Sequence, residues 1–197
     1  VEPFMSGLGG IAFLVYRDRS DTEIRDIAIA RHDGSSWTPG RLVHSDGWKI
    51  NGCPVNGPAV AVQGHLVAVA WFTVDPTDRG HVRIAFSQDG GETFGNPIEM
   101  AGPDPLGRVG LTMLPNGTAW VLWLESVKEG LAEVRLSSVN VGGDRGKPIV
   151  VTTTSGSRAS GIPRLASLGG DLFVAWTDAR DQAGKASSRR VLSARVH

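Results

Sequence analysis

Charged side chains gather where apolar segments of the chain end. The densest group is residues 17–26, which hold three arginines and four carboxylates directly after the apolar segment around Tyr16. A guanidinium group pairs with a carboxylate through two parallel hydrogen bonds, so arginines brought together by a fold suit a ligand with an acidic group. The residues that we expect to contact such a ligand are Arg17, Arg25, Lys49, Asn56, Arg108, Arg158, Arg164 and Asp178.

Three residues have side chains that could take part in bond cleavage. Glu125 and Asp18 each stand two positions after an aromatic residue, and Tyr16 is the single tyrosine of the chain. Carboxylates in pairs, such as Asp18 with Asp26, can hydrolyse glycosidic bonds or bind Ca²⁺. The alternatives are a solvated loop with internal ion pairs for residues 17–26 and a buried core position for Tyr16.

Metal and thiol chemistry have little support in the sequence. The five histidines show none of the spacings that bind zinc, and Cys53 is the one cysteine, which excludes an internal disulfide. Cys53 stands between Gly52 and Pro54 without a patterned histidine, so we expect a small buried thiol rather than a nucleophile. We expect neither a metal nor a cofactor.

The overall charge argues against partners that need a strong electrostatic field. Lys and Arg together number 20, as do Asp and Glu, so the balance gives no reason to expect nucleic acid or an anionic membrane surface. No apolar run approaches the length of a membrane span. The N-terminal residues lack the positive and apolar regions of a signal peptide, and the chain begins with Val1, so we expect it to start inside a longer product.

The elements that must position these side chains form a repeat. Tyr16, Trp71, Trp123 and Trp176 stand in similar apolar segments and are separated by 55, 52 and 53 residues. A second apolar segment precedes three of the four across a glycine-containing turn that is typical of hairpins. Further segments follow, giving four strands per unit of about 53 residues. This pattern matches the blade of a propeller, so we expect an all-β propeller of four-stranded antiparallel blades.

Counting the segments predicts an incomplete ring. The first and last units have three each and the middle two have four, so the inner strand of the first and the outer strand of the last are absent. We expect about three and a half blades, divided near residues 1–48, 49–102, 103–156 and 157–197. Six units would need roughly 320 residues, so further N-terminal blades or self-association would close the ring. A two-sheet sandwich is the alternative.

One turn of the second unit carries a distinct motif. Asp89 can accept main-chain hydrogen bonds across the turn, the two following glycines tolerate positive φ, and Phe94 can pack between blades. Residues 87–94, SQDGGETF, resemble the Asp box S-x-D-x-G-x-T-[FW] of sialidases and related propellers, and residues 32–38 are a degenerate version. The resemblance implies a structural role, away from the substrate pocket, for Ser87, Asp89, Gly91, Thr93 and Phe94.

The rest of the chain is also similar to the sialidase-like (BNR repeat) proteins of bacteria. Residues 46–58, DGWKINGCPVNGP, are the most typical stretch. The resemblance implies a six-bladed propeller, usually exported to the periplasm or the medium, that binds a glycan or another small polar ligand near its axis. The binding face is implied to bear the second-to-third and fourth-to-first strand connections.

The resemblance supplies roles for some residues and leaves one without a match. Sialidases hold the substrate carboxylate with three arginines and use a tyrosine nucleophile, a helper glutamate and an aspartate acid/base. Carried over, Arg108 with Arg158 or Arg164 would supply arginines, and Glu125 the helper. The late tyrosine of the family falls in residues 161–164, GIPR, and is missing. Three hypotheses stay open: a glycoside hydrolase acting on acidic sugars, a non-catalytic binding or scaffolding propeller, and a truncated product whose open edges pair with another chain.

Overall fold

The protein is built from β-strands. The structure, a computed structural model, describes all residues except 1–3, 9, 53, 129, 179–189 and 197, so Cys53 lies outside the described part. The strands form four antiparallel sheets, and the one helix among the described residues is the 3₁₀ turn η1 (Arg158–Ser160). No described helix is long and apolar enough to cross a membrane.

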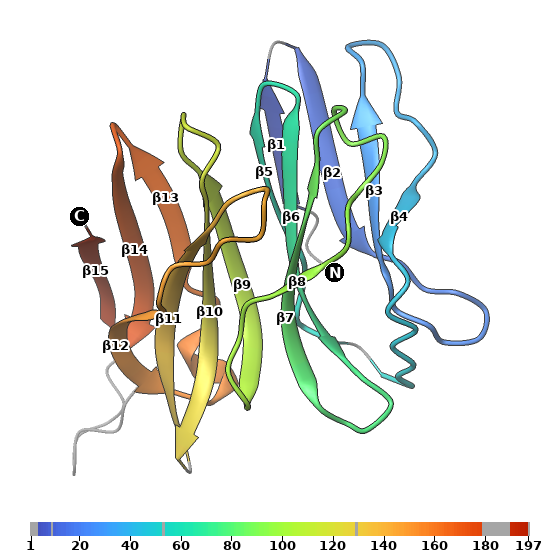
Figure 1. Cartoon of the computed structure of the whole chain (residues 1–197). Helices are drawn as coiled ribbons and strands as arrows, with labels where there is room; N and C mark the ends of the chain where they lie inside the picture. The colour runs from blue at the N-terminus through green and yellow to red at the C-terminus, as the bar shows by residue number, and fades with distance from the viewer. Residues whose placement is uncertain (1–3, 9, 53, 129, 179–189, 197) are drawn as a thin grey trace.

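Each sheet takes its strands in chain order, as the spacing of the repeat predicts (Figure 1). The first sheet holds β1 (Phe4–Leu8), β2 (Ile11–Arg17), β3 (Ile27–His32) and β4 (Arg41–His44). The second holds β5 (Ala59–Gln63), β6 (Leu66–Val74), β7 (Gly80–Ser87) and β8 (Ile98–Glu99). The third holds β9 (Pro105–Met113), β10 (Ala119–Lys128), β11 (Leu131–Val139) and β12 (Ile149–Ser155). The fourth holds β13 (Arg164–Leu168), β14 (Asp171–Asp178) and β15 (Arg190–Val196).

The sheets are arranged as the blades of a propeller rather than as a sandwich. The first strands of the four sheets are neighbours in chain order, β1 beside β5, β5 beside β9 and β9 beside β13. In Figure 1 the first and fourth sheets stand at opposite ends of the array. The expectation of an all-β propeller of antiparallel blades is therefore confirmed.

The prediction that the first unit lacks its inner strand is wrong. β1 pairs with β2 in antiparallel register, from Phe4 opposite Val15 to Leu8 opposite Ile11. The segment FMSGL is short and carries Ser6 and Gly7, so it lacks the apolar pattern that marks the other inner strands. The segment is a strand because it pairs with β2 and packs beside β5. The fourth sheet has three described strands, without an outer one, as expected.

Each pair of neighbouring sheets encloses an apolar core. Side chains alternate between the two faces of a strand. A sheet that lies between two others, such as the second, therefore packs one face against each neighbouring sheet. Trp71 lies in the core between the first and second sheets, and Trp123 in the core between the second and third. Both are completely buried. Burial of apolar surface contributes about 25 cal/mol per Å², which makes these cores the main source of stability.

The turn around Asp89 satisfies its own polar groups. The Asp89 carboxylate accepts hydrogen bonds from the main-chain N–H groups of Glu92 and Thr93, at 3.0 and 2.9 Å, and from the Ser87 and Thr93 hydroxyls, both at 2.6 Å. Gly90 and Gly91 have positive φ. Phe94 is half-buried against the core between the first and second sheets. The Asp33 turn of the first sheet repeats the pattern with the N–H groups of Ser35 and Ser36.

Asp89→Ala should lower the melting temperature at pH 7. The hydrogen bonds, led by that of Ser87, hold the pKa of Asp89 well below its usual range. Because the folded-state pKa is depressed, this stabilisation is present above the unfolded-state pKa of about 3.9 and is lost as the pH falls below it. The difference from wild type should therefore shrink between pH 5 and pH 2, as followed by circular dichroism. The exposed Asp21→Ala is the control, and equal melting temperatures at pH 7 for wild type and Asp89→Ala would contradict the role of the turn.

Candidate functional site

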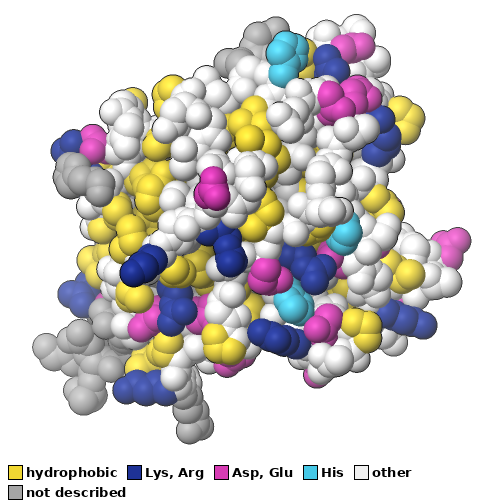
Figure 2. Space-filling view, viewed as in Figure 1, with side chains coloured by type: hydrophobic (Ala, Val, Ile, Leu, Met, Phe, Trp, Pro, Cys, Tyr) yellow, Lys and Arg dark blue, Asp and Glu magenta, His cyan; other side chains and the backbone are white. Residues whose placement is uncertain are grey.

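The connections expected to carry the site emerge at one end of the sheets. They are the loops from β2 to β3 and from β6 to β7, and the segments that lead from one sheet to the next at residues 45–58, 100–104 and 156–163. In Figure 1 they lie along the lower edge. Figure 2, drawn from the same side, shows Lys, Arg, Asp and Glu side chains intermixed over the lower half of the molecule. We call this the loop end and the opposite one the turn end.

Arg17 is buried at the loop end and joins three segments. Its guanidinium donates to the main-chain oxygens of Asn56 (3.0 and 3.1 Å), Arg25 (2.6 Å) and Phe72 (2.6 Å). It also lies 4.7 Å from the centre of the Trp48 ring, within cation–π distance. Burial lowers its pKa to about 10. These contacts place Arg17 as a link between the first two sheets.

Asn56 continues that link to the third sheet. Its side-chain oxygen accepts from the Arg108 N–H at 3.0 Å, and its side-chain nitrogen donates to the Leu106 oxygen at 3.2 Å. A Cβ atom at Gly107 would lie 2.8 Å from the Asn56 side chain, so the close approach requires glycine there. Asn56 therefore connects the segment that enters the second sheet with the start of β9.

Arg108 extends the link to the fourth sheet from a strained backbone position. Its φ is 54°, and the register between β9 and β10 shifts beside it, so β9 carries a bulge there. The buried guanidinium donates to Ser160 Oγ (2.9 Å) and to the oxygens of Gly161 (3.1 Å) and Gly156 (3.3 Å). Burial, together with repulsion from Arg158, lowers the pKa of Arg108.

Exposed cationic side chains surround this buried framework. Arg158 lies in η1, within the turn that Arg108 holds, and Arg164 begins β13. Lys49 lies in the segment between the first two sheets; all three are exposed. Lys49 also lines a hollow of about 320 Å³ together with residues 47, 48, 74–76 and 78. Among the described residues, neither Arg108 nor Arg158 forms an ion pair with a carboxylate.

Other expected ligand residues have structural contacts. Arg25 is buried and its guanidinium donates a hydrogen bond to the Glu23 carboxylate at 2.6 Å. Asp178 is also buried, and its carboxylate forms an ion pair with the Arg190 guanidinium at 3.8 Å. Asp26 is buried, accepts from the Gly47 N–H at 2.9 Å, and has a pKa raised by burial. Asp18 is exposed at the start of its loop.

The residues considered for bond cleavage are not brought together. Glu125 is 1% exposed and accepts hydrogen bonds from Trp123 Nε1 (2.7 Å) and from the N–H groups of Gly102 (3.1 Å) and Asp104 (2.9 Å). The Tyr16 hydroxyl packs against Gly40, just before the outer strand β4. In the described part of the chain no hydrogen bond connects Tyr16, Asp18 and Glu125. No group of three or more described His, Cys, Asp or Glu side chains is arranged to hold a metal ion.

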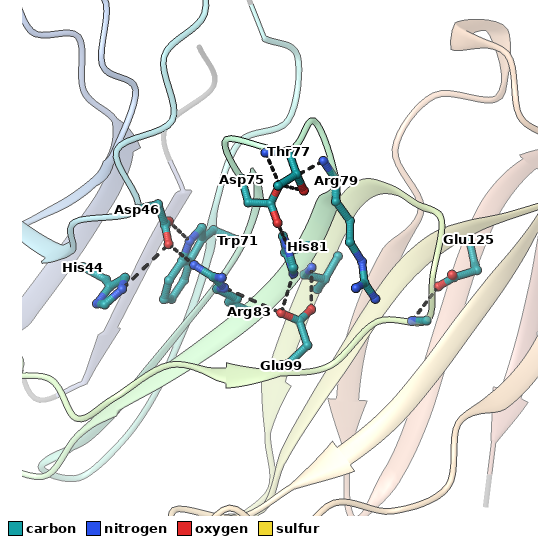
Figure 3. Close-up of polar contacts among 12 residues, drawn as sticks. His44, Asp46, Trp71, Asp75, Thr77, Arg79, His81, Arg83, Glu99 and Glu125 are labelled. Atoms are coloured by element: carbon teal, nitrogen blue, oxygen red, sulfur yellow. Dashed lines mark hydrogen bonds and ion pairs between the residues drawn. The ribbon is translucent and has the colours of Figure 1, made fainter.

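Sequence reasoning missed a charged network beside Trp71 (Figure 3). Asp46 accepts from Trp71 Nε1 at 2.6 Å and forms an ion pair with Arg83. Glu99 lies 3.6 Å from Arg83 and 2.8 Å from His81, whose other ring nitrogen lies 3.0 Å from Asp75. The available signal was the repeat itself: an arginine stands directly across the ladder from each of Trp71 and Trp123.

Solved structures show which proteins share the fold. Hadza microbial sialidase Hz136 aligns with a TM-score of 0.63 at 20% identity, over 98% of this chain and 43% of that one. A protein of unknown function from Dyadobacter fermentans aligns at 0.65 and 16% identity, over 97% of this chain and 51% of that one. The GH43 protein BlXynB from Bacillus licheniformis aligns with a TM-score of 0.61 at 15% identity, over 98% of this chain and 38% of that one. The chain thus spans about half or less of each of these proteins.

These likenesses establish the propeller fold of this chain. No protein-family model matches the chain. No curated protein matches it at a significant level.

Asn56→Ala should lower the free energy of unfolding by about 1–3 kcal/mol, because it leaves the Arg108 N–H and the Leu106 oxygen without their side-chain partner. Urea unfolding followed by tryptophan fluorescence measures this. The matched control is Asn51→Ala, an exposed asparagine of the same segment. Equal effects of the two substitutions would show that Asn56 does not link the sheets.

Proposed function

We propose that this chain is part of a carbohydrate-directed propeller that binds an acidic saccharide at the loop end. The observation that carries the proposal is the pair Arg108 and Arg158. Arg108 donates hydrogen bonds to Gly156, Ser160 and Gly161, which lie on either side of Arg158 in the chain, so the two arginines belong to one small region. Repulsion from Arg158 adds to the effect of burial in lowering the pKa of Arg108. Within the described residues neither charge is paired with a carboxylate, so an anionic ligand group bound by the exposed Arg158 would supply the missing counter-charge.

The environment of the pair increases the gain from binding an anion. Arg108 is buried and donates to neutral oxygens alone, so its charge is desolvated without ionic compensation. Electrostatic attraction is stronger where water is excluded. Arg158 is exposed in the turn that Arg108 fixes, which presents its donors to solvent in a defined place. A carboxylate suits this arrangement because a guanidinium can bind it with two hydrogen bonds.

The saccharide part of the proposal is supported by the fold and the neighbouring groups. Proteins with this fold include one named a sialidase and two named as arabinanases. Lys49 adds an exposed donor at the same end, while Arg17 and Arg25 hold the loops from within. Polar groups of this kind suit a polyhydroxylated ligand.

A non-catalytic binding module is the second candidate, favoured by the contacts of Glu125. Both of its carboxylate oxygens accept hydrogen bonds from buried or main-chain donors, so the side chain holds the entry to the third sheet. The missing late tyrosine points the same way. Turnover of a fluorogenic sialoside by the purified chain would favour the hydrolase hypothesis, whereas binding without turnover would favour the module.

We also propose that the protein works outside the cytoplasm, in the periplasm or the medium. The resemblance of residues 46–58 and 87–94 to exported bacterial propellers supports this. Fractionation of the source cells, with the protein detected by antibody, is the test, and recovery in the cytoplasmic fraction would contradict it.

Arg158→Ala should weaken the binding of N-acetylneuraminic acid about tenfold or more, because a charge-assisted hydrogen bond is lost. Titration calorimetry measures the affinity, and the melting temperature should stay unchanged because the side chain is exposed. The control is Lys147→Ala, which removes one exposed positive charge from the turn end. Equal affinities for wild type and Arg158→Ala, or no binding by the wild type, would overturn the proposal.

The isolated chain should self-associate through the outer face of the fourth sheet. Leu168 is 74% and Val191 78% exposed, and both lie on the face of the sheet opposite to the one that packs against the third sheet. A second copy would remove this apolar surface from water. Light scattering on wild type and on a Leu168→Lys, Val191→Lys double variant measures the mass. A monomeric wild type would contradict self-association and leave ring closure to further blades.

A further inference from the structure

A second hollow lies at the turn end, away from the arginine pair. It has a volume of about 540 Å³ and opens between the Asp89 turn of the second sheet and the loop from β11 to β12 of the third. Pockets for small ligands typically measure about 300–1,000 Å³, so the space can take one or two sugar rings. It is separate from the acidic-saccharide site, because the β7–β8 and β11–β12 connections leave the sheets at the opposite end.

The walls of the hollow combine apolar and neutral polar groups. Phe94 and Ile98 are half-buried, and Val141 on the facing loop is 44% exposed. Gln88 and Asn96 are exposed amides that line the same space. An amide offers both donors and an acceptor, which is what a row of hydroxyl groups requires.

The charges around the hollow argue for a neutral ligand. Among the described residues that line it, Asp89 alone has a charged side chain. Its oxygens already accept four hydrogen bonds within the turn, which leaves it little capacity for a cationic ligand. No lining Lys or Arg is present in the described part to attract an anion.

The hollow is also shaped before a ligand arrives. The Asp89 hydrogen bonds fix the backbone that carries Gln88 and Phe94, and Phe94 is anchored against the core below it. On the other side, Asn140 and Asp144 close the loop by hydrogen bonds of 2.9 and 3.0 Å. Preorganised walls reduce the entropy lost on binding.

We propose that this hollow binds a neutral saccharide. One apolar C–H face of a pyranose or furanose ring would pack on Phe94 and Val141, and its hydroxyl groups would exchange hydrogen bonds with Gln88 and Asn96. The site would serve as an attachment point for glycan, distinct from the acidic-ligand site at the loop end.

The proposal is tested by titrating the chain with lactose, xylobiose and arabinobiose, followed by saturation-transfer NMR. At least one sugar should bind, and Gln88→Ala and Asn96→Ala should each weaken that binding about fivefold or more. Both residues are exposed, so the melting temperatures should equal that of wild type. The matched control is Gln63→Ala, an exposed glutamine in the β5–β6 turn at the same end, which should leave binding unchanged.

Two further measurements separate this site from the one at the loop end. Arg158→Ala should keep the neutral-sugar affinity, and N-acetylneuraminic acid should not compete. The proposal is overturned if none of the three sugars binds at millimolar concentration, if Gln63→Ala weakens binding as much as Gln88→Ala, or if Arg158→Ala abolishes it. If the wild type binds a neutral sugar but not N-acetylneuraminic acid, the loop-end proposal is contradicted and the proposal for the turn-end hollow is supported.

Discussion

A chain of hydrogen bonds at the loop end holds the four sheets in their relative positions. It runs from Arg17 in the first sheet to Asn56 before the second, then to Arg108 in the third and Ser160 before the fourth. Each partner is a main-chain group or a side chain fixed by one. Apolar packing between sheets has little directional preference, whereas these bonds set distance and orientation. These hydrogen bonds also fix the positions of the loops that carry Lys49 and Arg158.

The same series of hydrogen bonds explains why the arginines at the loop end have different roles. Arg17 and Arg108 are buried with their donors directed at main-chain oxygens, and removing them from water without those acceptors would be very costly. Arg158 sits one turn away in solvent. Burial and the direction of the donors, rather than residue type, decide which guanidinium stabilises the fold and which can meet a ligand.

Each anchor tryptophan shows how the repeat has diverged. Trp71 donates to Asp46 from the preceding connection, whereas Trp123 donates to Glu125 on its own strand. An arginine lies across the ladder in both cases. In the fourth sheet Trp176 Nε1 is buried with no hydrogen-bond partner among the described residues. The aromatic anchor is thus maintained by packing, while the acceptor for its N–H can come from different segments.

Local features of this protein were determined by the sequence alone. The spacing of Tyr16 and the three anchor tryptophans predicts the sheets, and the Asp89 turn forms from hydrogen bonds within residues 87–94, because those partners are close along the chain. The tertiary structure decided β1, which is defined by its neighbours, and the roles of Arg17 and Asp46. The acceptors of Arg17 include Phe72, 55 positions away, and Asp46 meets Arg83 across 37 positions. Contacts of that separation depend on how the sheets pack, which no local pattern of residues records.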